Sequence, residues 1–377
     1  MPRYTLASPW RLTYKLGMTD SPQIICLFSG GLDSLLAAKL LQRQGLHVRC
    51  LHLFSPFFGS PESVERWRRL YGLDIVCLDM GERFVTMLTH RPEHGFGKVL
   101  NPCVDCKILQ LRAAREYMEA TGARALATGE VLGQRPMSQR RDTLNLIKRE
   151  AGVGDNLLRP LSALCLEPTA VEKCGLVDRT QLLGIYGRGR REQLALAREY
   201  ALEEIPTPAG GCRLTERENA RRYWAVMTNV THPVRADFDL ANLGRQCWYV
   251  TPRASWWLSV GRNSADNDRL ALAVRPGDVL LQLAEVPGPL ALARHGELWP
   301  EEVFLSAAAH TASYAPRAVE RGRAVVQGTQ GGQFLREVTV TPHRQEDLWG
   351  QTAWESIKPL LRAEARERAR EAARHRR

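Results

Sequence analysis

The sequence has no long hydrophobic run. Nowhere in its 377 residues does an apolar stretch approach the roughly 18 residues that a membrane-spanning helix needs. The first twenty residues also lack the unbroken apolar segment of a signal peptide. We therefore expect a cytoplasmic protein that has no membrane partner. The sequence also shows no internal repeat.

Acidic residues are too few to balance the basic ones. The chain has 52 Lys and Arg against 41 Asp and Glu, a formal net charge of +11. This excess favours a polyanionic partner such as RNA. The composition, 44% hydrophobic and 25% charged, is that of a folded globular protein, and the length suits two domains.

Structural disulfides are not expected in a cytoplasmic chain, although this one has nine cysteines. Six of them occur singly in apolar surroundings, and we interpret these as core or incidental residues: Cys26, Cys50, Cys77, Cys165, Cys174 and Cys247. The other three, Cys103, Cys106 and Cys212, need a different explanation.

Predicted strands alternate with predicted helices through the first 168 residues. This order predicts an α/β fold with a parallel, doubly wound five-stranded sheet. The expected strands are 23–28, 47–54, 73–79, 123–129 and 156–164. The expected parts of the chain are an N-terminal arm (1–20), an α/β domain (21–168), a helical extension that carries Cys212 (169–235), a small α+β domain (240–345) and a basic C-terminal helix (346–377).

A glycine-containing loop joins the first strand to the first helix. Its sequence is Ser29-Gly30-Gly31-Leu32-Asp33-Ser34. Two glycines let the backbone turn tightly and present N–H groups to an anion, and the helix after the loop adds its positive end. The two serines supply hydroxyl donors, and the carboxylate of Asp33 suits a Mg²⁺ ion. A glycine turn capped by a serine would be the purely structural alternative.

This string resembles the pyrophosphate loop of the PP-loop ATPases, which cleave ATP between the α and β phosphates and adenylate a substrate. The resemblance implies a Rossmann-like PP-loop domain that uses ATP and Mg²⁺. It also implies that Ser29, Gly30, Gly31, Asp33 and Ser34 lie around the pyrophosphate. The loop does not choose the substrate, because amide ligases and base-modifying enzymes share it.

Two further segments resemble the tRNA 4-thiouridine synthases. The first is TGEVLGQ at 128–134, continued by Met137-Ser138-Gln139, which lies after the fourth strand at the ligand-binding edge of the sheet. The second is the RPL segment at 159–161, whose Arg can make a bidentate contact with phosphate. The resemblance adds four residues to the expected ATP site: Gly129, Gln134, Ser138 and Arg159.

The segment NPCVDC at 101–106 is similar to the NPC-x-x-C segment of the tRNA 2-thiouridylases. Its cysteine pair also resembles that of the iron–sulfur-dependent tRNA thiolases. A third cysteine, Cys212, comes after two glycines about a hundred residues later, and a pair plus one distant cysteine is the arrangement of those thiolases.

The proposed chemistry needs a sulfur nucleophile to displace the adenylated uridine oxygen. Three thiolates can hold a [4Fe–4S] cluster with one open iron, or one cysteine can carry a persulfide that another resolves. A zinc knuckle or a buried redox pair is the structural alternative, but no second C-x-x-C or H-x-x-H completes a tetrahedral zinc site. We therefore expect Cys103, Cys106, Cys212 and Asp33 to be catalytic.

The region after residue 245 resembles the NFACT RNA-binding domain. The similarity lies in a GRN-x-x-x-N string at 261–267, a P-x-D at 276–278 and a PG turn at 287–288. Arg262, Asn263 and Asn267 are the expected RNA contacts. Arginines also flank the expected ATP cleft, where they form either a solvated face or a track for the RNA backbone. They are Arg135, Arg140, Arg141, Arg188, Arg190 and Arg191.

Together the motifs predict an ATP-dependent tRNA thiouridine synthase that is supplied with sulfur by a cysteine desulfurase or by sulfide. Two alternatives stay open at this point. One is another adenylating enzyme, a ligase or amidotransferase, that acts on a small substrate. The other is a non-catalytic RNA-binding protein that has kept the loop.

Overall fold

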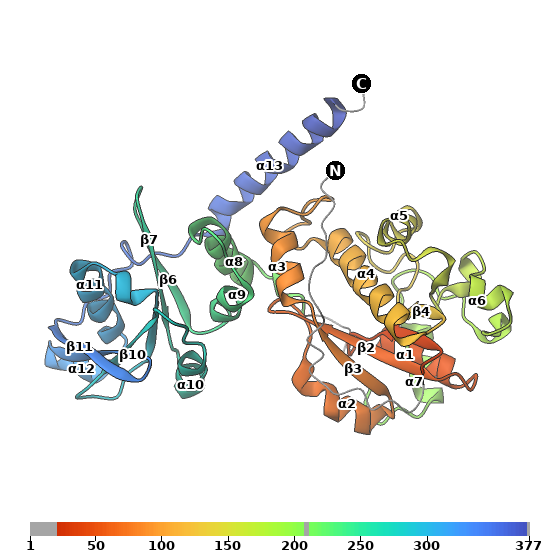
Figure 1. The fold of residues 1–377 in the computed structure, drawn as a ribbon, viewed down its shortest axis with the longest axis horizontal. Helices are drawn as coiled ribbons and strands as arrows, with labels where there is room; N and C mark the ends of the chain where they lie inside the picture. The colour runs from red at the N-terminus through yellow and green to blue at the C-terminus, as the bar shows by residue number, and fades with distance from the viewer. Residues whose placement is uncertain (1–20, 207–210, 375–377) are drawn as a thin grey trace. The chain divides into compact units, whose positions relative to one another are not determined.

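The computed structural model describes residues 21–206 and 211–374. The predicted N-terminal arm, 1–20, lies outside the described residues. The chain divides into two compact units, one ending at Thr215 and the other beginning at Glu216 (Figure 1). Within the described residues, no helix is both long and apolar enough to cross a membrane.

The first unit is built on the predicted parallel five-stranded sheet, with strand order β3-β2-β1-β4-β5. The strands are β1 Ile24–Leu27, β2 Val48–Phe54, β3 Asp74–Asp79, β4 Ala125–Thr128 and β5 Leu157–Leu158. Because β1 and β4 are buried on both faces, all their residues are apolar or small. The last strand is shorter than predicted, since the chain leaves the sheet at Arg159.

Helices cover both faces of this sheet. One layer contains α1 (Leu32–Gln42), α2 (Val64–Tyr71) and α7 (Arg191–Glu199), which share a hydrophobic core with one face of the strands. On the other face, α4 (Cys103–Thr121) and α5 (Arg141–Ala151) pack against Ile25, Leu51 and Leu126 (Figure 1). The remaining helices of this unit are α3 Gly81–Thr89 and α6 Ala170–Lys173, with 3₁₀ turns η1 Pro61–Ser63, η2 Gly154–Asn156, η3 Ala163–Cys165, η4 Arg179–Gln181 and η5 Arg213–Thr215.

The second unit contains a six-stranded antiparallel sheet with strand order β11-β10-β8-β9-β7-β6. Its strands are β6 Arg245–Val250, β7 Ser255–Val260, β8 Val279–Leu283, β9 Ala291–Arg294, β10 Ala324–Gln330 and β11 Gln333–Val340. Its helices are α8 Arg217–Asn229, α9 Arg235–Ala241, α10 Ser264–Leu272, α11 Glu301–Ala312, α12 Pro316–Arg321 and α13 Trp354–Arg374, with one 3₁₀ turn, η6 Gly296–Leu298.

The stretch expected as a helical extension, 169–235, is shared between the two units. Its first part carries α6 and α7 and packs on the parallel sheet, whereas α8 packs against α9 and α13 in the second unit. Cys212 lies just before the boundary, on the side of the parallel sheet.

Candidate active site

The loop between β1 and α1 is held in shape by its own serines. Ser34 Oγ accepts a hydrogen bond from the Ser29 N–H at 3.2 Å and donates to the Gly31 carbonyl at 2.8 Å. Gly30 adopts φ +80°, and a Cβ added there would lie 2.5 Å from the Trp67 ring. Only glycine fits this position, so the loop is preformed at the positive end of α1.

One carboxylate oxygen of Asp33 contacts protein groups, and the other has no hydrogen-bond partner among the described residues. Its Oδ2 accepts a hydrogen bond from Gln134 Nε2 at 2.8 Å and lies 3.9 Å from Arg190 Nη2. Its Oδ1 is buried and has no hydrogen-bond partner among the described residues. A buried carboxylate oxygen without a partner is costly unless a ligand satisfies it, and a hard cation such as Mg²⁺ is a suitable ligand.

Gly129 brings the segment after β4 into contact with this loop. A Cβ at Gly129 would lie 2.4 Å from the Ser34 nitrogen and 2.5 Å from the Asp33 carbonyl, both backbone atoms. The glycine therefore permits close approach of the segment after β4 to the backbone of Asp33 and Ser34. The sequence analysis predicted both segments to be part of one ATP site.

A buried ionic group lies directly after Gly129. Glu130 contacts Arg159 Nε at 3.0 Å and lies 4.0 Å from Lys107 Nζ, and Thr128 Oγ1 donates to it at 3.2 Å. Burial opposes ionisation of Glu130, but the two cations and the hydrogen bonds outweigh it and lower its pKa. The predicted phosphate ligand Arg159 is thus engaged by Glu130, although its Nη2 is buried and has no hydrogen-bond partner among the described residues.

A cavity of about 310 Å³ opens beside these groups. Its polar lining includes Ser29, Gly31, Asp33, Ser34, Gly129, Glu130 and Ser138. Apolar side chains, among them Leu51, Leu53, Phe58 and Phe84, line it as well. Gln134 and Arg159 do not line the cavity; they support residues that do.

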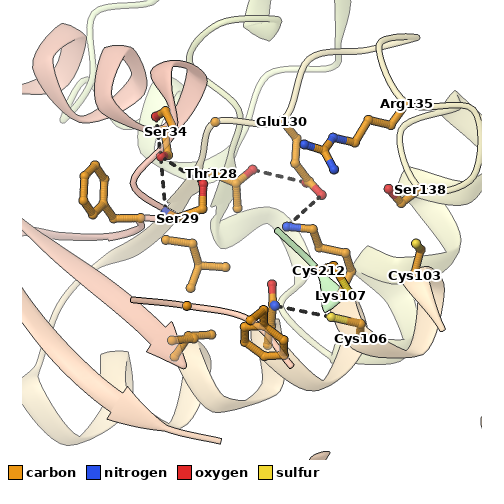
Figure 2. A pocket seen from close by; sticks show the side chains of 18 of the residues that line it. Ser29, Ser34, Cys103, Cys106, Lys107, Thr128, Glu130, Arg135, Ser138 and Cys212 are labelled. Atoms are coloured by element: carbon orange, nitrogen blue, oxygen red, sulfur yellow. Dashed lines mark hydrogen bonds and ion pairs between the residues drawn. The ribbon is translucent and has the colours of Figure 1, made fainter. Parts of the chain in front are cut away.

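The three predicted cysteines line this same cavity. Cys103 and Cys106 lie in the first turn of α4, and Cys212 comes from the loop before η5. Figure 2 shows the three cysteines toward one end of the cavity and Ser29 and Ser34 toward the other. Residues separated by more than a hundred positions therefore meet next to the phosphate loop.

Each thiol of the pair receives a hydrogen bond from an amide. Asn101 Nδ2 donates to Cys103 Sγ at 3.2 Å, and Gln110 Nε2 donates to Cys106 Sγ at 3.3 Å. Burial, reinforced by the neighbouring thiols, raises the pKa of Cys106 well above its ordinary range. Burial likewise raises the pKa of Cys212, to about 11. At neutral pH both groups are protonated thiols.

The thiols as placed do not form a metal site. Across residues 21–206 and 211–374, no group of three or more His, Cys, Asp or Glu side chains is arranged to hold a metal ion. All three cysteines are free thiols. A [4Fe–4S] cluster is larger than a single ion, and the three cysteines that would hold it line one cavity.

Asp105, the acid between the two cysteines, anchors the segment that precedes them. Its carboxylate is buried and accepts hydrogen bonds from the backbone N–H groups of Glu93 and His94, at 2.8 and 3.1 Å. Its side chain thus fixes the start of α4. Asp105 does not line the cavity and is not placed to bind a ligand there.

Several polar residues that line the cavity were not foreseen from the sequence, among them Lys107 and His52. Lys107 directly follows the cysteine pair, and its position next to Cys106 in the sequence could have indicated that it belongs to the site. His52 lies near the end of β2, where Nδ1 is 2.9 Å from the Phe28 carbonyl and Nε2 accepts from the Ser60 N–H at 2.9 Å. Because it is buried, its pKa is lowered and the ring is neutral.

The three residues expected to contact RNA lie together around α10 of the second unit. Asn263 is the N-cap of this helix and accepts a hydrogen bond from the Asp266 N–H at 2.9 Å. Asn267 accepts from the Leu290 N–H at 3.1 Å, and Arg262 pairs with Asp266 at 2.6 Å. Both asparagines thus have structural tasks, and a role in RNA binding stays a prediction.

The first unit is a Rossmann-like α/β domain with a glycine-containing loop between β1 and α1, and this part of the chain resembles a known family. Residues 19–168 match the family described as thiamine biosynthesis protein (ThiI). The chain is 29% identical over 136 residues to a tRNA-specific 2-thiouridylase MnmA of Desulfosudis oleivorans, covering 34% of this chain and 36% of the relative. It is 26% identical over 170 residues to a probable tRNA sulfurtransferase of Lysinibacillus sphaericus, covering 43% and 38%.

A solved structure of a 4-thiouridine synthetase in complex with RNA and ATP is also similar. The identity is 21% and the TM-score 0.33, over 49% of this chain and 42% of that chain. The chain spans well under half the length of the two curated relatives, and the matched family covers only its first unit.

Proposed function

We propose that this protein is an ATP-dependent tRNA thiouridine synthase. It adenylates a carbonyl oxygen of a uridine, releases pyrophosphate, and replaces the activated oxygen with sulfur. The observation that carries the proposal is a single cavity that joins a phosphate-binding loop to three cysteine thiols. Similarity of the first unit to tRNA sulfurtransferases supports the same assignment.

The phosphate end of the cavity suits ATP. The N–H groups at the start of α1 and the hydroxyls of Ser29 and Ser34 would bind the pyrophosphate, and Asp33 Oδ1 would bind Mg²⁺. Lys107, held by Glu130, adds a positive charge to the same cavity. Developing negative charge on the phosphates is thereby offset in a partly buried setting.

The cysteine end suits the delivery of sulfur. A cysteine thiolate that attacks the outer sulfur of a desulfurase persulfide would take up that sulfur as its own persulfide, with the desulfurase thiolate as the leaving group, and hold it next to the activated uridine. Free sulfide, the other donor, is already reduced and would attack the activated carbon directly, with AMP as the leaving group. A [4Fe–4S] cluster on the three cysteines is the other prediction, and iron analysis of anaerobically purified protein decides between them. About four irons per chain, lost when any one cysteine is replaced by serine, would establish the cluster.

The second unit and the net charge of +11 support a tRNA substrate. A polyanion is attracted to such a chain, and a small separate domain is a common means of holding RNA beside a catalytic one. Arg262, Asn263 and Asn267 are the proposed contacts, with the cytoplasm as the site of action.

The test is a reconstituted reaction. The full chain is incubated with ATP, Mg²⁺, a sulfur donor and tRNA from a strain that lacks the gene, and the nucleosides are analysed by mass spectrometry. A gain of roughly 16 mass units on a uridine, the difference between sulfur and oxygen, together with AMP release, is the expected result. AMP formed with a small molecule and no RNA would instead indicate a ligase or amidotransferase, and no AMP with any RNA would indicate a binding protein.

A further inference from the structure

An exposed tyrosine is held rigidly beside the loop that lines the cavity. The side chain of Tyr186 is 67% exposed, the largest exposure among the large hydrophobic residues of the first unit that the structure describes. Its backbone forms a parallel bridge with Leu132, and the next N–H, of Gly187, donates to the Leu132 carbonyl at 2.8 Å. The preceding Ile185 is buried.

The ring itself rests on a glycine. A Cβ at Gly133 would lie 3.2 Å from two carbons of the Tyr186 ring, and Gly133 has φ +79°. The Tyr186 ring therefore lies close to the Gly133 backbone through Cε2 and Cζ, while most of the side chain is left in solvent. An aromatic ring supported on one side and open on the other is a suitable platform for stacking a base.

This platform is connected to the phosphate loop. Gln134, the neighbour of Gly133, donates to Asp33, and Gln193 of α7 lies 3.4 Å from the Gln134 side chain. Arg190, on the same segment as Tyr186, lies 3.9 Å from Asp33. The segment 185–193 thus forms part of the border of the site, and a group bound to it is near the catalytic groups.

Two arginines next to the tyrosine have no acidic partner in the part of the chain that the structure describes. Arg188 and Arg191 are exposed, and within the described residues neither forms an ion pair. Two other arginines that the sequence analysis singled out are engaged, because Arg140 pairs with Asp142 at 3.2 Å and Arg141 donates to the Cys165 carbonyl at 2.9 Å. A single-stranded nucleic acid offers phosphates, which bind cations, and base faces, which stack on aromatic rings. Two arginines without an ion pair beside an exposed ring can bind both.

We infer that residues 186–191 are an RNA-binding lip of the active site. Tyr186 stacks on an unpaired base adjacent to the target uridine, and Arg188 and Arg191 contact the flanking phosphates. This inference rests on the proposed function, since it names the part of the first unit that grips the RNA. An unpaired base is required because bases in an A-form helix do not offer their faces to a side chain.

The inference is tested by measuring tRNA affinity of the full chain by fluorescence anisotropy at several salt concentrations. Tyr186→Ala should weaken binding about tenfold and Tyr186→Phe should not, because stacking needs only the ring. Arg188→Ala and Arg191→Ala should each lower the salt slope by about one. Arg69→Ala, an exposed arginine of α2, is the matched control and should leave the slope unchanged.

Separate outcomes overturn the separate proposals. If the unmodified protein does not bind tRNA at any salt concentration, the proposed function fails and this inference with it. If it binds tRNA but Tyr186→Ala and Arg188→Ala bind equally well, the lip is wrong and the proposed function stands. Unchanged melting temperature and ATP affinity of each variant show that the fold and the phosphate loop are intact, as expected for exposed side chains.

Discussion

A substitution at Asp33 tests the proposed chemistry of the loop 29–34 most directly. One of its oxygens is occupied by Gln134, and the other is buried without a partner among the described residues. We predict that Asp33→Asn lowers AMP formation by about a hundredfold or more, because the amide cannot serve a metal–pyrophosphate group as a carboxylate does. AMP release by the purified variant is the measurement.

The fold should survive this change, because no hydrophobic packing depends on the carboxylate. Circular dichroism and the melting temperature check that point. Asp142→Asn, an exposed position on α5, is the matched control and should keep full turnover. Undiminished AMP release by Asp33→Asn would remove Asp33 from the active site.

The thiols differ in the pH at which they become reactive. Since burial raises the pKa of Cys212 to about 11 and that of Cys106 further, both are protonated at a mildly alkaline pH in the free protein. We predict that iodoacetamide modifies the exposed Cys174 well before either of them, and that the rate at Cys212 rises with pH up to about 11. Peptide mass spectrometry after timed labelling measures each site; equal rates at mildly alkaline pH would contradict the burial.

Single residues also show what the sequence could not reveal. The string around Gly261 and Asn263 predicts an RNA contact, which stays a prediction. The structure adds that Asn263 caps α10 and that Asn267 accepts a hydrogen bond from the Leu290 N–H. Cap residues and ligand residues have the same chemistry, a polar side chain that bonds to N–H groups. Only the three-dimensional structure shows which partner is present.

At the scale of elements, most of the parallel sheet could be predicted because its strands are short apolar runs between helical patterns. The last strand could not be bounded, since β5 pairs through only two residues, Leu157 and Leu158. The RPL segment then leaves the sheet and brings Arg159 to Glu130. An ionic group formed between two distant loops has no signature in either loop alone.

The contact between β4 and the phosphate loop depends on one glycine. We predict that Gly129→Ala destabilises the protein by about 1–3 kcal/mol and weakens ATP binding, because the new Cβ would lie 2.4 Å from the Ser34 nitrogen. Thermal unfolding and ATP titration measure both effects. Gly350→Ala, in the second unit, is the control, since a Cβ there meets only the Glu346 carbonyl oxygen at 3.5 Å, an ordinary contact. Wild-type stability and ATP affinity in Gly129→Ala would mean that the two backbones are not in close contact.

At the scale of the whole molecule, composition predicted two parts but not the position of their border. The sequence analysis placed α8 in one helical extension, 169–235, together with α6 and α7, because Arg and Glu continue evenly through the region. In the structure the second unit begins at Glu216, and α8 buries Tyr223 against Phe238 of α9. Helix periodicity is the same on both sides of the border, so only long-range contacts reveal where the unit changes.

This border decides where the chain can be divided. A protein ending at Thr215 keeps every residue that lines the cavity. A protein ending at residue 240 retains α8 but loses the antiparallel sheet with Ser255, whose hydroxyl donates to the Asn229 carbonyl. It also loses Asn242, the C-cap of α9, which accepts a hydrogen bond from the Tyr223 hydroxyl. The second fragment would expose Tyr223 and Phe238, which are fully buried in the complete chain.

We predict that the fragment ending at Thr215 is monodisperse and binds ATP as the full chain does, whereas the fragment ending at residue 240 aggregates. The shorter fragment should lose at least about tenfold in tRNA affinity and part of the salt dependence, because the cations of the second unit no longer release counterions. Size-exclusion chromatography, ATP titration and anisotropy against salt are the measurements. Full tRNA affinity in the fragment ending at Thr215 would mean that the second unit does not bind RNA and has another function. The RNA would then be bound by the first unit alone, through Tyr186 and Arg188.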